Sequence, residues 1–329
     1  MRNAARMVPA FILAAAVTIP ASAQDLLAQA NSALQAGEAD HALALLYSLP
    51  ASGGGQAEDH NLQCRVRYTL EQWNEAVSQC EQAIRLDEVN SDYHLWLGRA
   101  LGQKASQASF LTAYSLAKRV QAEFAEAVRL NPSNAEALYA LGDYDVQAPG
   151  IVGGGADKAQ DIAAQLAKVD AARAHELLAH IAEGRKDYGA AEREFKLAVA
   201  EGAHPALQWS SLAGFYSRRQ RWTEMETAVR NVLTAARRDK RAAFALYDGA
   251  GVLTESKRDP ELAARMLEDY LAGSAKTEEA PAFVAHDRLA RLKEQLGDPA
   301  AANRERAAAL ALAHDYKAGR GTSSQEAMN

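Results

Sequence analysis

Apolar residues recur along the chain at helical spacing, in paired segments separated by short polar turns. In one stretch Ala76, Cys80 and Ala83 are followed, after a polar turn, by Leu97-Gly98. Spacings of three and four residues place side chains on one face of a helix. The pattern therefore predicts amphipathic helices joined as hairpins. A second stretch repeats it with Phe124, Ala127, Val128, Leu130, Leu138, Leu141 and Gly142.

The same frame recurs with varying fidelity over residues 25–316. One hairpin cannot bury its own apolar face, so successive hairpins must stack around a continuous core. Small residues let the two helices of a hairpin approach, and large residues fill the gaps between hairpins. These 292 residues, less about fifteen inserted ones, are close to eight units of 34 residues. We therefore predict an all-α solenoid of about eight helical hairpins.

These residues resemble the tetratricopeptide repeat (TPR), a helix–turn–helix unit of 34 residues. The resemblance covers residues 24–318 and implies a right-handed α-solenoid that binds proteins or peptides on its concave face. Within residues 60–160, the segment Tyr93–Arg99, Cys80 and a glycine-rich turn are similar to a group of exported bacterial TPR proteins that carries no established activity. The family's carboxylate clamp, which grips peptide C-termini with Lys and Asn, is not reproduced.

Two units are longer than the repeat, and we expect their extra residues to form enlarged turns. The third unit carries about ten extra residues, near 103–115, and the fourth about five, within 147–156. Both turns would lie on one edge of the solenoid, where insertions often mark a working face. The turn Val152–Gly155 is not a nucleotide-binding loop, because Ala156 and Asp157 follow where that loop needs Lys and then Ser or Thr.

Composition and charge narrow the classes of function. Hydrophobic residues make up 48% of the chain, enough for a folded core, so disorder throughout is excluded. The two cysteines are too few for a disulfide-rich scaffold or a four-thiolate zinc site. The formal net charge is −6 and there is no basic stripe, so we exclude nucleic acid as a partner.

The first 23 residues resemble a secretory signal peptide. Its apolar run, Val8–Ile19, is too short to span a bilayer, and small residues precede the junction of Ala23 and Gln24. We expect cleavage at that junction and export to a bacterial periplasm; an N-terminal anchor that is never cut is the alternative. No later segment is apolar and long enough to span a membrane, and we expect residues 319–329 to form a flexible tail.

Motifs for catalysis or metal binding are weak in this sequence. His175 and His180 enclose a glutamate, but a zinc-peptidase helix needs its second histidine four residues after the first. A spacing of five turns the second imidazole about 140° around the helix. The sequence also has no nucleophile elbow of the Gly-x-Ser-x-Gly type. We therefore expect no enzyme activity, no cofactor and no metal ion.

Cys64 and Cys80 fall on the two helices of the second hairpin, and both should point into its core. An oxidising compartment permits a disulfide, and closing a loop of about 17 residues would stabilise the fold by roughly 3 kcal/mol. Two reduced cysteines acting as small apolar side chains are the alternative. The sequence leaves the pairing open, and a thiol titration would decide it.

The resemblance also implies where a partner binds, because ligands of TPR arrays usually meet the first helix of each unit on the concave face. Trp, Tyr and Arg are the residues most enriched at binding hot spots. Trp96 lies about 100° around the helix from the packing residue Leu97, so we expect it exposed in the groove, with a core position as the alternative. The candidate partner-binding residues are Asn61, Arg65, Tyr68, Leu95, Trp96, Arg99, Tyr139 and Asp143.

The sequence thus predicts a protein–protein interaction scaffold or adaptor of the bacterial cell envelope that binds a peptide segment or a folded partner. Aromatic side chains would bury apolar groups, while Arg65 and Arg99 would hold acidic or carbonyl groups. One alternative is an enzyme, or an enzyme subunit, with its site in the enlarged turns of the third and fourth units. Another is a purely structural spacer in an envelope assembly. The oligomeric state does not follow from the sequence.

Overall fold

The computed structural model describes residues 21–49, 56–239, 243–274 and 276–316, and helices dominate this part of the chain. The described residues contain sixteen α-helices, one 3-10 helix and no strand, which confirms the predicted all-α class. The helices are α1 (Ala21–Ala36), α2 (Ala39–Tyr47), α3 (Ala57–Thr69), α4 (Trp73–Leu86), α5 (Ser91–Ser106), α6 (Phe110–Leu130), α7 (Ala135–Gln147), η1 (Gly150–Val152), α8 (Ala156–Leu166), α9 (Ala171–Gly184), α10 (Tyr188–Glu201), α11 (Pro205–Arg218), α12 (Trp222–Ala236), α13 (Phe244–Glu255), α14 (Pro260–Ala272), α15 (Ala282–Gln295) and α16 (Pro299–Leu312).

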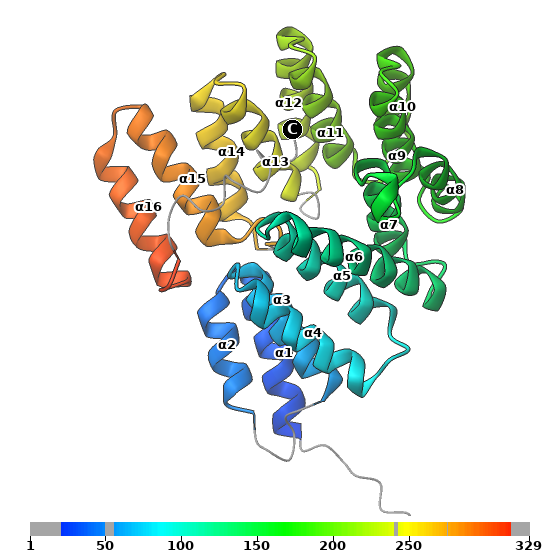
Figure 1. The fold of residues 1–329 in the computed structure, drawn as a ribbon. Helices are drawn as coiled ribbons and strands as arrows, with labels where there is room; N and C mark the ends of the chain where they lie inside the picture. The colour runs from blue at the N-terminus through cyan, green and yellow to red at the C-terminus, as the bar shows by residue number, and fades with distance from the viewer. Residues whose placement is uncertain (1–20, 50–55, 240–242, 275, 317–329) are drawn as a thin grey trace, which may run out of the picture.

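Consecutive helices pair as hairpins, from α1–α2 to α15–α16, and the described residues form the eight that the sequence predicts. Each hairpin packs on the next, so the array is a solenoid (Figure 1). The first helices of successive hairpins, from α1 to α13, contact one another directly. They therefore form the inner, concave layer of the curve.

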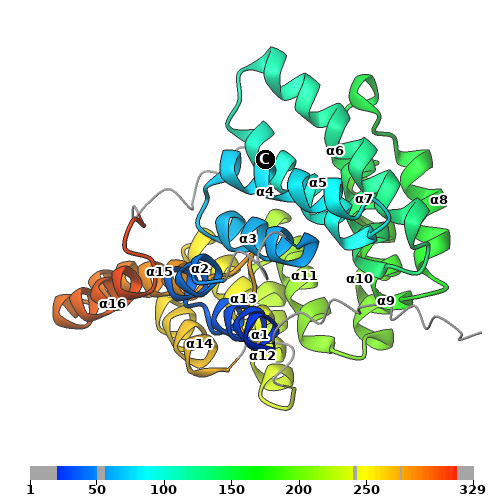
Figure 2. The same ribbon diagram turned by 90° about the horizontal axis from the view of Figure 1, so that it is seen from below.

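The array curls until its first and last hairpins meet (Figures 1 and 2). The backbone N–H of Lys276 donates to the carbonyl of Gln35 at 2.7 Å. Gly37 has a φ of 85°, which favours glycine, and any side chain there would overlap Ala282. Glycine at this position therefore allows the N-terminal hairpin to approach α15.

The buried apolar side chains of the described residues form two clusters. One, which includes Leu101 and Leu138, runs from α3 to α9. The other joins Leu46 of α2 to Phe283 of α15 and continues through the C-terminal hairpins. Because burial of apolar surface is the main stabilising term in folding, the contact between the two ends is part of the fold.

The extra residues of the third unit form helix, so the predicted enlarged turn near 103–115 is wrong. α5 continues to Ser106 and α6 begins at Phe110, which leaves only residues 107–109 as a turn. Residues 103–118 contain neither Gly nor Pro, so nothing in the insertion interrupts a helix. The lengthened start of α6 carries the exposed side chain of Phe110.

The extra residues of the fourth unit do form an enlarged turn, residues 148–155, between α7 and α8. Gly153, with a φ of 106°, ends η1 within this turn. The hydroxyl of Tyr144 lies 2.8 Å from the carbonyl oxygens of both Ala117 in α6 and Val152 in the turn. The enlarged turn of the fourth unit therefore packs against α6 of the third unit.

The predicted signal peptide and the predicted tail lie largely outside the described residues. Residues 1–20 of the predicted signal peptide and the whole predicted tail, 319–329, lie outside the described residues. α1 begins at Ala21, and Ala23, the last residue of the predicted signal peptide, is fully buried. None of the described helices combines the length and the apolar character that crossing a membrane requires.

Candidate functional site

The candidate site lies on α3 and α5, around the ring of Trp96. The guanidinium carbons of Arg65 and Arg99 lie 5.4 Å and 4.7 Å from the centroid of that ring. The ring of Tyr68 meets it edge-on, with centroids 5.5 Å apart. Cation–π and edge-to-face contacts each contribute about 0.5–2 kcal/mol. We call Arg65, Tyr68, Trp96 and Arg99 the arginine–tryptophan cluster.

The repeat itself aligns the two arginines. Arg65 and Arg99 are 34 residues apart, one repeat length, so they occupy the same position in adjacent units. α3 and α5 contact each other in the inner layer. The two guanidinium groups therefore share one indole.

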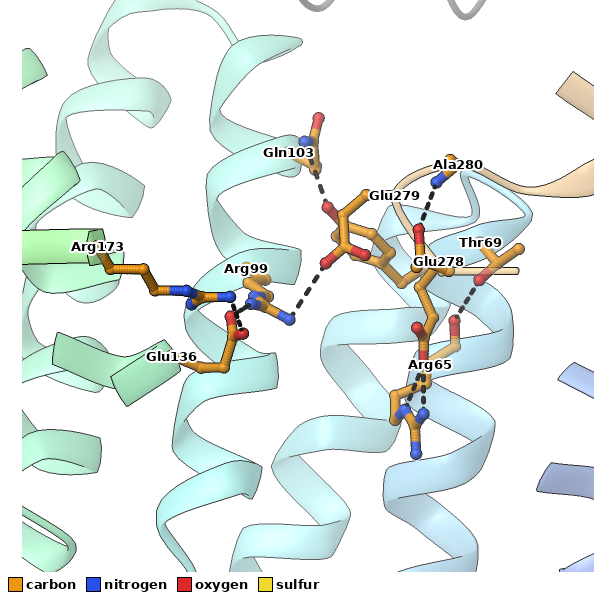
Figure 3. A network of polar contacts seen from close by, with 11 residues as sticks. Arg65, Thr69, Arg99, Gln103, Glu136, Arg173, Glu278, Glu279 and Ala280 are labelled. Carbon is orange, nitrogen blue, oxygen red and sulfur yellow. Dashed lines mark hydrogen bonds and ion pairs between the residues drawn. The ribbon is translucent and has the colours of Figure 1, made fainter. Parts of the chain in front are cut away.

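A segment from the far end of the chain binds both arginines (Figure 3). It belongs to the linker between α14 and α15, and we call its residues 276–280 the acidic loop. The Nε of Arg65 donates to Glu278 Oε1 at 2.7 Å. Nη1 of Arg99 lies 3.2 Å from Glu279 Oε1. The concave face is thus occupied here by the chain's own residues.

Arg99 also begins a chain of charges that leads along the inner layer (Figure 3). Its Nη2 donates to Glu136 of α7 at 2.9 Å, and Arg173 of α9 donates to the same carboxylate at 2.6 Å. The guanidinium carbon of Arg173 lies 5.6 Å from the ring centroid of Tyr139. Glu136 therefore links arginines from two repeats and brings Tyr139 into the network.

The two carboxylates beside Arg99 have pKa values shifted in opposite directions. Burial alone would raise the pKa of Glu136, but the hydrogen bonds and charges of Arg173 and Arg99 outweigh it and lower the pKa. Partial desolvation raises the pKa of Glu279, whose side chain stays 40% exposed; Arg99 opposes this shift and Glu278 adds to it. The ionised form of Glu136 is therefore stabilised by its surroundings, whereas that of Glu279 is disfavoured.

A disulfide joins Cys64 to Cys80 and ties α3 to α4 beside the cluster. The two Cα atoms are 5.2 Å apart, and both side chains are fully buried. The sequence left this pairing open, and the structure forms it. Because Cys64 precedes Arg65, the bridge constrains the helix that presents this arginine.

Leu95 and Trp96 do not line an open groove, so that expectation is wrong. Leu95 is 3% exposed and Trp96 8%, and both belong to the cluster of buried side chains around α3 to α9. Two guanidinium groups and Tyr68 cover the indole, and burial of so large a ring is strongly favourable. Trp96 forms the floor on which the arginines lie, and Leu95 is a core residue.

The remaining predicted residues lie around this cluster. Asn61, one turn before Arg65 in α3, has a buried Oδ1 with no hydrogen-bond partner among the described residues. Tyr139 is half-buried beneath Arg173. Asp143, one turn farther along α7, accepts a hydrogen bond from a side chain of its own helix. The structure thus connects Tyr139 to the cluster through Arg173 and Glu136. Asn61 and Asp143 take no part in these ion pairs.

A second group of polar side chains lies between the inner helices α9, α11 and α13. The hydroxyl of Ser211 donates to Glu176 at 2.6 Å, and that of Ser210 donates to Asp248 at 2.6 Å. Burial raises the pKa of Glu176 to about 6 and also raises that of Asp248, because one hydroxyl replaces only part of the lost hydration. We call these four residues the carboxyl–hydroxyl pairs.

The two histidines considered for zinc have separate neighbours. Nδ1 of His175 lies 2.7 Å from Glu194, whereas the ring of His180 packs edge-on against Phe195 with centroids 5.3 Å apart. Over the part of the chain that the structure describes, no three side chains of His, Cys, Asp or Glu gather in a way that could hold a metal ion.

Sequence reasoning missed four residues that complete the site: Glu136, Arg173, Glu278 and Glu279. One feature of the sequence could have indicated the acidic loop: the linker between α14 and α15 has nine residues, whereas the linker between α4 and α5 has four. However, no local sequence pattern predicts that this linker contacts Arg65, which lies 213 positions before Glu278.

No family model matches the sequence, and no curated protein matches it. Among solved structures, the chain is similar to TTC0263, a thermophilic TPR protein of Thermus thermophilus, with a TM-score of 0.50, 16% identity, and coverage of 59% of this chain and 98% of that one. A TPR protein from Parabacteroides merdae gives a TM-score of 0.44 and 14% identity over 83% of this chain and 99% of the other. PilF of Pseudomonas aeruginosa gives a TM-score of 0.44 and 15% identity, with coverage of 72% of this chain and 96% of the other. The first likeness shows the fold, a solenoid of TPR-like hairpins.

Proposed function

We propose that this chain is a non-enzymatic scaffold or adaptor of the bacterial cell envelope that binds a segment of a partner protein on the concave face of its solenoid. The observation that carries the proposal is the arginine–tryptophan cluster, which holds two side chains of the acidic loop, a turn between α14 and α15. Buried aromatic rings together with arginines are typical of the centres of protein interfaces.

The fold also supports a binding function. Stacked helical hairpins create an extended concave surface, and repeat proteins use such surfaces to bind partners. Because a fold alone assigns no function, the proposal depends on the cluster and on its position in the inner layer of helices.

The surroundings of the polar groups favour binding over catalysis. Glu136 is fixed between two arginines, and Glu176 accepts from Ser211. Groups engaged in this way serve to hold the hairpins in register, and a general acid or base needs access to a substrate proton.

The envelope location depends on the predicted signal peptide. Cleavage after Ala23 would remove the first three residues of α1, which begins at Ala21. We expect N-terminal sequencing of the protein from a periplasmic fraction to begin at Gln24. A protein that keeps Met1 and stays in the cytoplasm would contradict the envelope assignment.

Capture of partners from envelope extracts tests the binding function. The double variant Arg65→Ala/Arg99→Ala removes both guanidinium groups of the cluster. Its matched control is Arg129→Ala/Arg185→Ala, which removes arginines that are 67% and 49% exposed. Circular dichroism first establishes that both variants remain helical.

We expect the control to retain the partners of the unaltered protein and the cluster variant to lose them about tenfold or more, as for a binding hot spot. Identical captured proteins from all three chains would contradict binding at the cluster.

A further inference from the structure

The acidic loop is held in two separable ways. Its backbone is anchored at both ends: the N–H of Lys276 donates to the carbonyl of Gln35, and the hydroxyl of Tyr270 donates to the carbonyl of Ala280. Between these anchors, the side chains of Glu278 and Glu279 alone reach the arginines. The carboxylates can therefore leave the cluster while both of these hydrogen bonds remain in place.

The cluster has the chemistry of a receptor for two neighbouring carboxylates. Arg65 contributes Nε and Nη2 to one oxygen of Glu278, and Arg99 meets Glu279 on the other side of the indole. Glu278 and Glu279 are the central residues of a turn that the N–H of Ala280 closes on the carbonyl of Thr277 at 3.2 Å. This turn presents one carboxylate to each of the two arginines that flank the indole. Bonds between guanidinium and carboxylate groups are among the strongest polar contacts in proteins.

The present occupant is poorly matched at one position. The Glu279 side chain is 40% exposed, and it shares the site with the like charge of Glu278. Partial desolvation raises the pKa of Glu279 and the charge of Glu278 adds to this shift, and Arg99 offsets only part of it. A longer acidic segment that brings its own backbone and apolar contacts could replace the two carboxylates at little net cost.

We propose that the arginine–tryptophan cluster recognises a segment of another protein that carries two consecutive acidic residues, and that Glu278 and Glu279 occupy the cluster until this segment binds. The inference rests on the proposed function and names the chemistry of the partner. In the free protein the loop lowers the apparent affinity for the partner by the fraction of molecules in which the cluster is open.

A second copy of this chain is a weaker occupant on physical grounds. Exchange of identical acidic loops between two copies would remake the same ion pairs and add none. Association would still cost translational and rotational entropy. A different protein is free of this restriction because its segment can add contacts that the loop lacks.

Direct binding of a short peptide tests the proposal. The probe is a fluorescein-labelled, blocked peptide with the sequence of residues 276–281, Lys-Thr-Glu-Glu-Ala-Pro, and its matched control has Gln-Gln in place of Glu-Glu. Fluorescence anisotropy compares the unaltered exported chain with the variant Glu278→Gln/Glu279→Gln, which opens the cluster but keeps the backbone anchors.

We expect the opened variant to bind the acidic peptide about tenfold more tightly than the unaltered chain. The control peptide should bind it about tenfold more weakly than the acidic one, and raising the salt from about 50 to 500 mM should weaken the acidic peptide's binding severalfold. Adding Arg65→Ala and Arg99→Ala to the opened variant should abolish the difference between the two peptides.

Three outcomes would overturn the proposal: equal affinity of the opened and unaltered chains, equal affinity of the two peptides, or sedimentation of the unaltered chain as a loop-exchanged dimer. Should the double variant unfold, Glu279→Gln alone provides the test, because this side chain is the more exposed of the two. The expected gain in affinity is then about threefold.

The peptide assay and the capture assay fail separately. If capture depends on Arg65 and Arg99 while the acidic peptide shows no preference, the scaffold function stands and the acidic partner is wrong. If capture is unchanged by the cluster variant, the proposed function itself is contradicted, whatever the peptide does.

Discussion

The arginine–tryptophan cluster and the carboxyl–hydroxyl pairs belong to the same inner layer of helices, yet their charges are compensated differently. At the cluster, Arg65 and Arg99 meet full opposite charges that come from α7 and from the acidic loop. At the pairs, Glu176 and Asp248 each receive one neutral hydroxyl. One region is joined to the far end of the chain, and the other is completed by the neighbouring helix.

This difference shows what each region contributes. A buried carboxylate with a neutral partner reduces stability when it ionises, because a hydroxyl replaces only part of its hydration. A paired guanidinium has little such penalty, but it depends on a distant segment remaining in place. The cluster is therefore the region where other carboxylates could replace those of the acidic loop. The carboxyl–hydroxyl pairs instead join neighbouring inner helices permanently.

Loss of the disulfide is the change with the largest expected effect, and it should act on the cluster's side only. Replacing Cys64 and Cys80 by Ser removes a cross-link that closes about 17 residues, so the free energy of unfolding should fall by roughly 3 kcal/mol. Urea denaturation measures this loss. Amide hydrogen exchange should speed up in α3 and α4 and remain unchanged in α11 and α13.

A thiol titration of the unaltered protein, purified without a reducing agent, provides the control. Two free thiols in the native state would show that the bridge is absent, and exchange that speeds up equally in all helices would contradict a local role.

Removal of one arginine tests whether the cluster's charges stabilise the fold. Arg99→Ala leaves Glu136 and Glu279 with fewer opposite charges and uncovers Trp96. Its side chain is 22% exposed, so we expect a loss of about 2–3 kcal/mol, somewhat less than for a fully buried pair. Chemical denaturation at pH 7.5 measures the change.

The matched control removes an arginine from the surface. Arg185 pairs with Asp157 at 3.3 Å, but their side chains are 49% and 102% exposed. Arg185→Ala should change stability by no more than about 0.5 kcal/mol. Equal effects of the two substitutions would show that the cluster behaves as an ordinary solvated surface.

At the carboxyl–hydroxyl pairs, removal of a charge is expected to increase stability. Glu176 is 7% exposed and its pKa is raised to about 6, above the ordinary value of 4.5. Its ionised form is therefore disfavoured in the folded state, and stability should increase as the pH falls from about 6.5 to 4.5. Glu176→Gln, which can still accept from Ser211, should stabilise the protein by about 1–2 kcal/mol at pH 7.5 and by almost nothing at pH 4.

Denaturation curves at both pH values, with Glu194→Gln as a control at a half-buried carboxylate, check this prediction. A loss of stability at pH 7.5 would mean that the charged hydrogen bond to Ser211 outweighs the cost of burial.

The sequence predicted whatever depends on local periodicity. Ala76, Cys80 and Ala83 lie on one buried face of α4, and eight hairpins follow from the repeat length. The same spacing placed Arg65 and Arg99 at equivalent positions on the inner layer. These features follow from residues that are close in the chain, so periodicity suffices to predict them.

Long-range contacts were beyond that reasoning. The contact of Glu278 with Arg65 depends on the total curvature of eight hairpins, and each hairpin adds a small rotation that no single repeat encodes. The burial of Trp96 has the same cause, since the acidic loop holds in place the arginines that cover the indole. The insertion of the third unit was misjudged for another reason: repeat spacing shows that residues are added but not whether they continue a helix.

The smallest expected effect concerns a histidine on α5, the helix that carries Trp96 and Arg99. Nδ1 of His94 in α5 lies 2.7 Å from Glu123 of α6, and this hydrogen bond raises the pKa of the imidazole although burial opposes it. A raised pKa means that the folded state favours the charged imidazole. The resulting stabilisation is complete below the unfolded value of about 6.5 and is lost as the pH rises through the folded pKa.

We therefore expect His94→Gln to lower the free energy of unfolding by about 1 kcal/mol at pH 6 and by less at pH 8. His175→Gln is the matched variant on the side of the carboxyl–hydroxyl pairs: it removes an imidazole at the same 2.7 Å distance from a glutamate, but with a side chain 22% exposed instead of 10%. Its effect should be smaller because water screens the pair. Equal pH slopes between pH 6 and 8 for His94→Gln and the unaltered chain would remove His94 as a source of the difference between the two regions.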